Sequence, residues 1–256
     1  LMPPGGARNA VDCALWELES RRASVPVWSL AGLRAAPRRL VTTFTLGADD
    51  PAVMARGARE RTEARSLKLK LTGQLDLDIA RVRAVRAARP DAWIGVDANQ
   101  GFAIAELDAL AAAMVEQNVS LIEQPLARGR EADLQGYRSP IPLAADESAL
   151  SFTDLAALVG RFQIVNIKLD KCGGLTEGLA MAAEARRLGL GVMVGNMVGT
   201  SLAMAPAFVL GQLCDVVDLD GPTFLARDRV PGILYERGEV WCGEEVWGAP
   251  RASVAA

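Results

Sequence analysis

Residues 67–99, LKLKLTGQLDLDIARVRAVRAARPDAWIGVDAN, decide the fold of this chain. Two short aliphatic runs, Leu67–Leu71 and Trp93–Val96, are typical of buried strands. The Leu75–Ala88 segment between them has the apolar spacing of an amphipathic helix. A strand, a helix and a second strand in this order predict a βαβ unit, whose two strands are parallel.

The same alternation of short aliphatic runs and longer helical segments continues along most of the chain. Strands are expected at Val41–Leu46, Leu67–Leu71, Trp93–Val96, Leu121–Ile122, Leu143–Ala145, Ile164–Ile167, Gly191–Val194 and Val216–Leu219. Helices are expected between them at Pro51–Glu63, Leu75–Ala88, Ile104–Glu116, Glu131–Tyr137, Ser151–Val159, Leu175–Leu188 and Ser201–Leu210. Eight strands that alternate with helices predict an α/β fold with a closed parallel barrel, with a doubly wound open sheet as the alternative. No G-x-G-x-x-G stretch follows the first strand, which argues against dinucleotide binding.

Two segments fall outside this alternation. Residues 10–22 are expected to form an amphipathic helix ahead of the first strand, and residues 232–247 an extended or hairpin segment without an eighth helix. The predicted organisation is therefore a leading helix and connection (1–39), a catalytic barrel (40–222) and a C-terminal return segment (223–256).

The composition excludes several classes of function. The chain of 256 residues has no histidine, which rules out Ser-His-Asp or Cys-His catalysis and His-ligated zinc. With 31 acidic and 28 basic side chains the net charge is −3, so no nucleic-acid partner is expected. The four cysteines have no C-x-x-C pair and are expected to be buried free thiols. The apolar stretches are too short for a membrane span and residues 1–6 do not resemble a signal peptide, so a cytoplasmic location is expected.

Charged side chains follow the ends of successive predicted strands, where a parallel barrel places its active site. Asp97, Glu123 and Asp146 follow three consecutive strands. A single carboxylate in such a place is more often a helix N-cap, but three that converge repel one another unless a cation lies between them. Ligand sets made only of oxygen favour Mg²⁺ over zinc, so these three residues are predicted to bind Mg²⁺.

Lysines lie on the predicted strands to either side of these carboxylates. Lys68 and Lys70 are two residues apart on one strand and are expected to point inward together, and Lys168 comes from a strand across the barrel. A like charge near Lys70 is expected to lower its pKa, which suits a general base, while Lys68 can stabilise negative charge on a substrate oxygen. The alternative is a buried ion network of lysines and carboxylates.

Five short motifs on consecutive strands, K-x-K, D-A-N, E-Q-P, D-E-S and a final K, begin at residues 68, 97, 123, 146 and 168. This order resembles the enolase superfamily in its muconate-lactonizing-enzyme-like subgroup, over about residues 10–222. The resemblance implies a TIM-type (β/α)7β barrel. It also implies an N-terminal α+β capping domain, which is expected to be absent from this sequence.

The resemblance implies a role for each charged residue. The three carboxylates are metal ligands, Lys70 and Lys168 are acid/base groups on opposite faces of the substrate, and Lys68 is an electrostatic partner. Asn99 is a supporting polar residue near the metal. The shared step is removal of a proton α to a carboxylate, with Mg²⁺ and lysine stabilising the enediolate.

The eighth strand distinguishes the reactions within the subgroup. Asp218-x-Asp220 resembles the D-x-D motif of dipeptide epimerases of the L-Ala-D/L-Glu type. Alternate strand residues place both carboxylates on one side, where they would offset the α-ammonium of a dipeptide; the alternative is that they only cap a turn. Further substrate contacts are expected from the first strand and from the end of the seventh, at Thr42, Thr43, Thr45, Asn196 and Met197.

The sequence therefore predicts a Mg²⁺-dependent isomerase that inverts the α-carbon of the C-terminal residue of a dipeptide. The alternatives are a lyase of the o-succinylbenzoate synthase type, an N-acylamino acid racemase, a cycloisomerase and a catalytically silent barrel. The expected partner is a small-molecule substrate, with no nucleic acid or membrane, and barrels of this family often form homo-oligomers. Because the return segment would run towards the capping domain, its larger apolar side chains are expected to be exposed, at Val240, Trp241, Val246 and Trp247.

Overall fold

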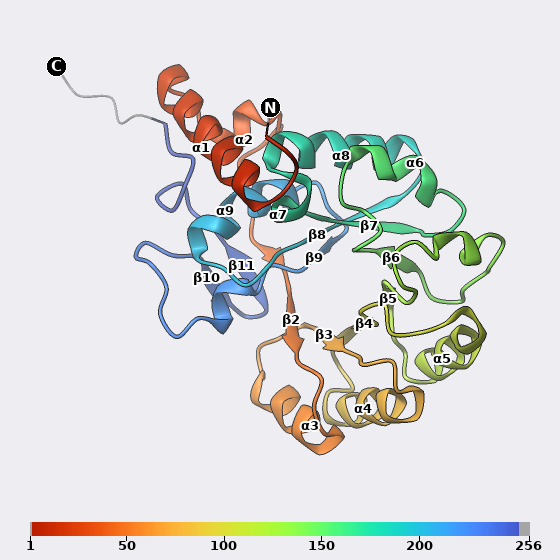
Figure 1. Ribbon diagram of the computed structural model, residues 1–256. Coiled ribbons are helices and arrows are strands. Elements are labelled where there is room, and N and C mark those ends of the chain that lie inside the picture. Colours follow the sequence, from red (N-terminus) through yellow and green to blue (C-terminus); the bar gives the residue numbers. More distant parts are fainter. Residues whose placement is uncertain (1, 251–256) are drawn as a thin grey trace.

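Eight parallel strands form the central sheet of the computed structural model, which describes residues 2–250 (Figure 1). Each strand is hydrogen-bonded to the next one along the chain. The strands are β2 (Thr43–Leu46), β3 (Ser66–Lys70), β4 (Trp93–Asp97), β5 (Leu121–Glu123), β6 (Leu143–Ala145), β7 (Ile164–Lys168), β8 (Gly191–Gly195) and β9 (Val216–Val217). This order confirms the predicted barrel of parallel strands. Residue 1 and residues 251–256, at the two ends of the predicted organisation, lie outside the described residues.

Helices cover the outside of the sheet between successive strands (Figure 1). α3 begins at Pro51 because the Asp50 side chain accepts a hydrogen bond from the Ala52 N–H, and a proline at the first helical position needs no partner of its own. Within residues 2–250 no helix combines the length and the apolar character that a membrane span requires. β2, β3 and β4 are followed by α3 (Pro51–Glu60), α4 (Leu75–Ala88) and α5 (Ile104–Glu116) in turn. β6 is followed by α6 (Leu155–Leu158), β7 by α7 (Leu169–Cys172) and α8 (Leu175–Arg187), and β8 by α9 (Ser201–Gly211).

Three predicted helices are shorter than expected by several residues. The helix predicted over Pro51–Glu63 ends at Glu60. The segment Glu131–Tyr137 contains only the 3₁₀ turn η1 (Glu131–Leu134), because the backbone becomes extended at Gln135 and Gly136 then adopts a φ of +81°. The segment Ser151–Val159 divides into the 3₁₀ turn η2 (Phe152–Asp154) and the single turn of α6. A third 3₁₀ turn, η3 (Gly221–Phe224), follows β9.

The first predicted strand is divided between two sheets. Val41 lies in β1 (Leu40–Val41), which pairs with β11 (Glu239–Trp241), and only the part from Thr43 onward joins the barrel. β10 (Leu234–Glu236) pairs with β11, which confirms the hairpin predicted for the C-terminal part of the chain. Two further helices, α1 (Gly6–Ala23) and α2 (Val27–Leu30), precede the barrel, and α1 packs against α7 and α8 (Figure 1).

The expectation of exposed apolar side chains in the return segment is wrong. Val240 is fully buried because β11 is the central strand of the small sheet, and Val246 and Trp247 are buried as well. The half-buried Trp241 ring packs edge-to-face on Phe208 of α9, with the ring centroids 5.8 Å apart. All four cysteines are free, and three of them are buried while Cys214 is half-buried.

Alternation along the strands gives the barrel interior two layers. Side chains two residues apart point the same way, so each strand can place an apolar residue low in the barrel and a polar one at its carboxyl end. The lower layer is an apolar cluster of Trp93, Leu121, Ala144, Ile164, Met193 and Val216. On five of these six strands a polar residue follows two or four positions later, at the mouth of the barrel; on β8 these positions are Gly195 and Met197.

Two loops at this mouth are tightly packed against each other. Gly73, which follows β3, has a φ of +80°, and a Cβ there would lie 2.3 Å from the carbonyl oxygen of Gly101. Only glycine allows both this backbone angle and this approach. The buried Asp78 carboxylate accepts hydrogen bonds from the backbone N–H groups of Thr72, Gly73 and Gln74, which fixes the loop after β3.

Candidate active site

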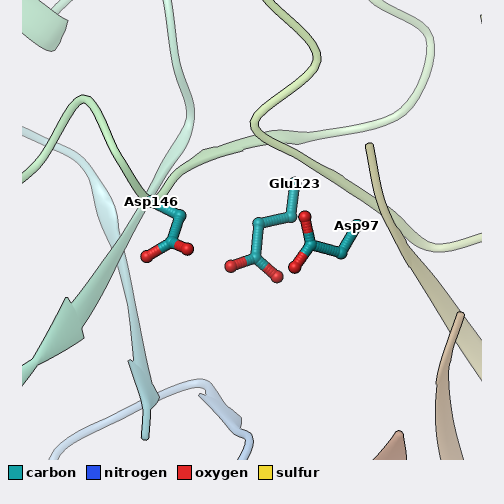
Figure 2. Close-up of side chains that lie close together, drawn as sticks. All are labelled: Asp97, Glu123 and Asp146. Carbon is teal, nitrogen blue, oxygen red and sulfur yellow. The ribbon is translucent and has the colours of Figure 1, made fainter. Parts of the chain in front are cut away.

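Three buried carboxylates meet at the mouth of the barrel. Asp97 and Glu123 are the last residues of the neighbouring strands β4 and β5, and Asp146 directly follows β6. One oxygen from each lies within 4.8 Å of the others, and Figure 2 shows Glu123 between the two aspartates. The structure thus brings together the three residues that were predicted to bind a metal.

The surroundings of Glu123 fit a cation. Its Oε1 accepts a 2.6 Å hydrogen bond from Asn166 Nδ2, while Oε2 is buried and has no hydrogen-bond partner among the described residues. Burial and the nearby Asp97 carboxylate raise the pKa of Glu123 to about 7. A buried oxygen without a hydrogen-bond partner, next to two other carboxylates, is stabilised by a hard divalent cation. Asp97, Glu123 and Asp146, called the carboxylate set below, therefore suit Mg²⁺.

Lysines flank this carboxylate set on both sides. Lys70, opposite Asp97 in the β3–β4 register, donates to Asp97 Oδ2 at 2.6 Å, and Lys168 at the end of β7 donates to Asp146 Oδ2 at 2.8 Å. Burial acts to lower the pKa of Lys168, but the Asp146 carboxylate raises it overall. Lys68 is buried, with its Nζ 3.6 Å from Glu123 Oε2.

A fourth lysine, Lys171, completes the group. Its ammonium donates to both the carboxylate and the backbone carbonyl of Asp146. Burial acts to raise the pKa of Asp146, but Lys168 and Lys171 together lower it to about 2. The chain contains four lysines in total, and all four contact a carboxylate of this site.

Side chains close the barrel between its last and first strands. Within residues 2–250 no backbone ladder joins β9 to β2. Instead, the Asp218 carboxylate accepts hydrogen bonds from the Thr43 hydroxyl and from Lys68, and Asp220 Oδ2 accepts one from the Thr45 N–H at 2.6 Å. The Thr42 hydroxyl accepts a 2.9 Å hydrogen bond from the N–H of Leu219 on the same seam.

The other residues predicted to contact the substrate differ in how buried they are and in whether they contact the carboxylates. The Asn99 side chain donates to Asp97 Oδ1, which places it beside the carboxylate set as expected. Asn196 is half-buried and lies against Gly221, where an added Cβ would come within 2.0 Å of its Nδ2. Met197 is exposed, and no contact joins it to the carboxylates in the part of the chain that the structure describes.

Sequence reasoning missed Asn166 and did not assign Lys171. Asn166 lies two residues before Lys168 on β7, so strand alternation alone would have placed both side chains on the inner face. Gly195 on β8 shows how closely they fill the mouth, because a Cβ there would lie 2.7 Å from Asn166 Oδ1 and 2.9 Å from Lys168 Cε. Lys171 is three residues beyond Lys168, one turn into α7.

A family model described as enolase C-terminal domain-like matches residues 52–232. The chain belongs to this family. The match covers β3 to β9 of the barrel, and therefore the three carboxylates and all four lysines of the candidate site.

Two relatives of this enolase-like chain are equally similar in sequence. An N-acetyl-D-glutamate racemase from Pseudoalteromonas sp is 41% identical over 239 residues, covering 93% of this chain and 75% of the racemase. An L-Ala-D/L-Glu epimerase from Escherichia coli (strain K12) is 41% identical over 242 residues, covering 94% of this chain and 74% of the epimerase.

Solved structures of enolase-like proteins share the fold. An enolase family member from Agrobacterium tumefaciens with homology to dipeptide epimerases, bound to sodium and L-Ala-L-Glu, superposes with a TM-score of 0.90 at 45% identity, covering 97% of this chain and 76% of that one. A dipeptide epimerase from Methylococcus capsulatus, bound to Mg and L-Arg-D-Lys, gives a TM-score of 0.86 at 33% identity, covering 91% and 69%.

Proposed function

We propose that this protein is a Mg²⁺-dependent isomerase that inverts the α-carbon of the C-terminal residue of a dipeptide. The observation that carries the proposal is the placement of Lys70 and Lys168 on opposite flanks of the buried carboxylate set. Two amines on opposite sides of one bound carbon acid can exchange its α-proton from either face. The relatives named as dipeptide epimerases support the same reaction.

The carboxylate of the substrate is proposed to lie next to the cation that the carboxylate set would hold. Asp97, Glu123 and Asp146 would hold Mg²⁺, which would supply the positive charge that makes the neighbouring α-proton more acidic. Lys168 donates to the Asp146 carboxylate at 2.8 Å, so this lysine is held at the edge of the site that the cation would occupy. Lys68, buried beside Glu123, adds a fixed positive charge that favours the enediolate.

The lysines then divide the proton transfer. With one stereoisomer bound, the neutral amine of one lysine takes the α-proton, and the C–H electron pair moves into the enediolate. The ammonium of the other lysine returns a proton to the opposite face of the carbon. In the reverse direction Lys70 and Lys168 exchange roles, so each must be able to give and to accept a proton.

Asp218 and Asp220 are proposed to bind the α-ammonium of the dipeptide. Lys68 and Thr43 already satisfy Asp218, whereas Asp220 lacks a cation of its own in the described residues and accepts only uncharged donors, the Thr45 N–H among them. Of the two carboxylates, Asp220 is therefore the one whose negative charge is available to pair with the ammonium of the substrate. An N-acylated amino acid has no ammonium at this point.

Racemisation of an N-acylated amino acid is the second candidate function. It is favoured by the 41% identity to the N-acetyl-D-glutamate racemase, a value equal to that for the E. coli epimerase. The two substrates share the carboxylate and the α-proton, so the same lysines serve both. They differ at the α-nitrogen, which is a charged ammonium in the dipeptide and an uncharged amide in the N-acylated amino acid. We expect Asp220 to contact this nitrogen.

Deuterium exchange tests both candidates in one experiment. The protein is incubated in D₂O with Mg²⁺ and either a panel of L,L-dipeptides or N-acetyl-glutamate, and the α-protons are followed by NMR. Epimerisation predicts deuterium at the C-terminal α-carbon together with the L,D diastereomer. Exchange of N-acetyl-glutamate alone would support the racemase instead, and exchange of neither substrate contradicts both.

Lys168→Ala and Lys168→Arg separate proton transfer from charge. The arginine variant keeps a cation next to Asp146, but a guanidinium does not act as a base near neutral pH. Both variants are expected to lose inversion by about 10²–10⁴-fold in kcat, while one stereoisomer still exchanges through Lys70. Inversion that survives in the arginine variant would contradict the role of Lys168 in proton transfer.

A further inference from the structure

Two motifs at the active site contain residues that the proposed reaction does not use. Gln124 follows the metal ligand Glu123, and Ser148 lies two residues after Asp146. Neither is a proposed ligand or base, and both are buried. The two side chains bond to each other, since Gln124 Nε2 donates to Ser148 Oγ at 2.8 Å.

The amide of Gln124 joins the carboxyl ends of two strands. Its Oε1 accepts hydrogen bonds from the backbone N–H of Asp146 at 2.9 Å and of Ser148 at 3.1 Å. Its Nε2 also donates to the Leu126 carbonyl at 2.9 Å. One side chain that follows β5 thus binds the backbone of the residue that carries the third carboxylate, directly after β6.

The backbone of Gln124 is held in an unusual conformation. Its φ is +39°, in the left-handed region that non-glycine residues rarely adopt. Two 2.8 Å hydrogen bonds fix it there, from Gln124 N–H to the Ala144 carbonyl and from Gln100 N–H to the Gln124 carbonyl. The turn that this conformation makes directs the Gln124 amide towards Asp146 and leaves Glu123 in the barrel interior.

The network continues outward to a charged residue. Ser148 Oγ donates to Glu131 Oε1 at 2.6 Å, and the Glu131 carboxylate also accepts the Gly129 N–H. Burial acts to raise the pKa of Glu131, but these hydrogen bonds, with that from Ser148 first, lower it overall. Ser148 is therefore oriented by an ionised acceptor, which leaves its oxygen lone pairs to receive Gln124 Nε2.

We infer that Gln124 is a positioning residue that sets the distance between Glu123 and Asp146 for divalent-cation binding, with Ser148 as its support. The inference rests on the metal-binding part of the proposed function and is independent of which substrate is used. Loss of an outer partner of a metal ligand typically weakens metal binding by about 10–100-fold.

The test compares two glutamines that bond to the same strand. Gln124 binds at the carboxyl end of β6, whereas Gln163 Oε1 accepts the Leu143 N–H at 2.9 Å at the opposite end. Gln124→Met and Gln163→Met each replace an amide by an apolar side chain of similar length. Titration calorimetry with Mg²⁺ alone gives the dissociation constant, and thermal unfolding gives the stability of each variant.

We expect both substitutions to lower the melting temperature and only Gln124→Met to raise the Mg²⁺ dissociation constant, by about tenfold or more. Ser148→Ala, which leaves the Gln124 bond to Asp146 in place, is expected to give a smaller increase, and it decides the matter if Gln124→Met does not fold. Unchanged affinity in the variants at Gln124 and Ser148, or an equal loss in Gln163→Met, would overturn the inference. Failure of the wild-type protein to bind Mg²⁺ would overturn the metal site itself, whereas Mg²⁺ binding without epimerisation leaves the role of Gln124 intact.

Discussion

Two groups of carboxylates share the mouth of the barrel, and they are built differently. Asp97, Glu123 and Asp146 lie at the carboxyl ends of strands that are joined by regular ladders, and one oxygen of each lies within 4.8 Å of the others. Among residues 2–250, Glu123 Oε2 has no hydrogen-bond partner. Asp218 and Asp220 lie where the ladder is interrupted, and they bond to the first strand of the barrel.

Carboxylate side chains therefore have two different roles at the mouth of this barrel. In the first group the backbone supplies rigidity, so the carboxylates are free to act on a cation. In the second group the carboxylates themselves replace missing ladder bonds, and part of their charge is used for that. We therefore expect the second group to bind the substrate ammonium less tightly than the first group binds a metal ion. We also expect substitutions in the second group to have smaller effects.

The largest effect is expected from a change in the first group. Glu123→Gln keeps an acceptor for Asn166 Nδ2 but removes the charge that a cation needs. We expect the Mg²⁺ dissociation constant to rise by more than about 100-fold, beyond the range for an outer partner, with proton exchange lost as in wild-type protein treated with EDTA. Calorimetry on Asp220→Asn, which should bind Mg²⁺ like the wild type, serves as the control. Similar losses in both variants would show that the two groups act as one.

A change in the second group should affect one substrate class and spare the other. Asp220→Asn keeps an acceptor for the Thr45 N–H and removes the negative charge. Because a hydrogen bond to a charged group contributes about 1.5–3 kcal/mol, kcat/KM for a dipeptide should fall by about 10–100-fold. The rate for N-acetyl-glutamate, measured in parallel by NMR, should change little. An equal fall for both substrates would contradict ammonium binding at Asp220.

The acidity of Asp220 gives the smallest expected effect. Burial and the neighbouring Asp218 carboxylate raise the pKa of Asp220 to about 6. Above that pH the group is charged and attracts an ammonium, and below it the group is neutral, so kcat/KM for a dipeptide should fall by up to about tenfold per pH unit. A pH–rate profile measures this, and the Asp220→Asn variant should lose the part of the fall that is centred near pH 6, while the part due to protonation of the lysine base remains. A wild-type profile that is flat down to pH 5 would argue against the role of Asp220.

The parts of the fold that depend on local pattern could be predicted from the sequence. The helices Leu75–Ala88 and Ile104–Glu116 have the predicted bounds because their apolar periodicity is unbroken. The helix predicted over Glu131–Tyr137 ends early, at Leu134, because Gln135 is extended and Gly136 has a positive φ, which are properties of the folded chain. The sequence pattern predicts Val41 as part of the barrel, because the pattern does not show that β11, almost 200 residues later, pairs with it.

The site shows the same division between local and distant information. Asp97, Glu123 and Asp146 could be found because the carboxyl ends of parallel strands meet at one edge of the barrel. Asn166 could have been found by strand alternation. The closing role of Asp218 could not, because its bond to Thr43 joins residues at opposite ends of the barrel sequence and depends on how the ring closes.

The distribution of lysine has a chemical consequence. All four lysines of the chain contact the carboxylates at the barrel mouth, and every other basic side chain is an arginine. Of the four, Lys70 has the most exposed side chain, at 31%, against 6% for Lys68 and 8% for Lys168. A reagent that acylates or alkylates amines therefore finds lysine side chains only at the candidate active site, and we expect it to reach Lys70 first. Chemistry that labels most proteins at many surface lysines would therefore, on this chain, label the mouth of the barrel.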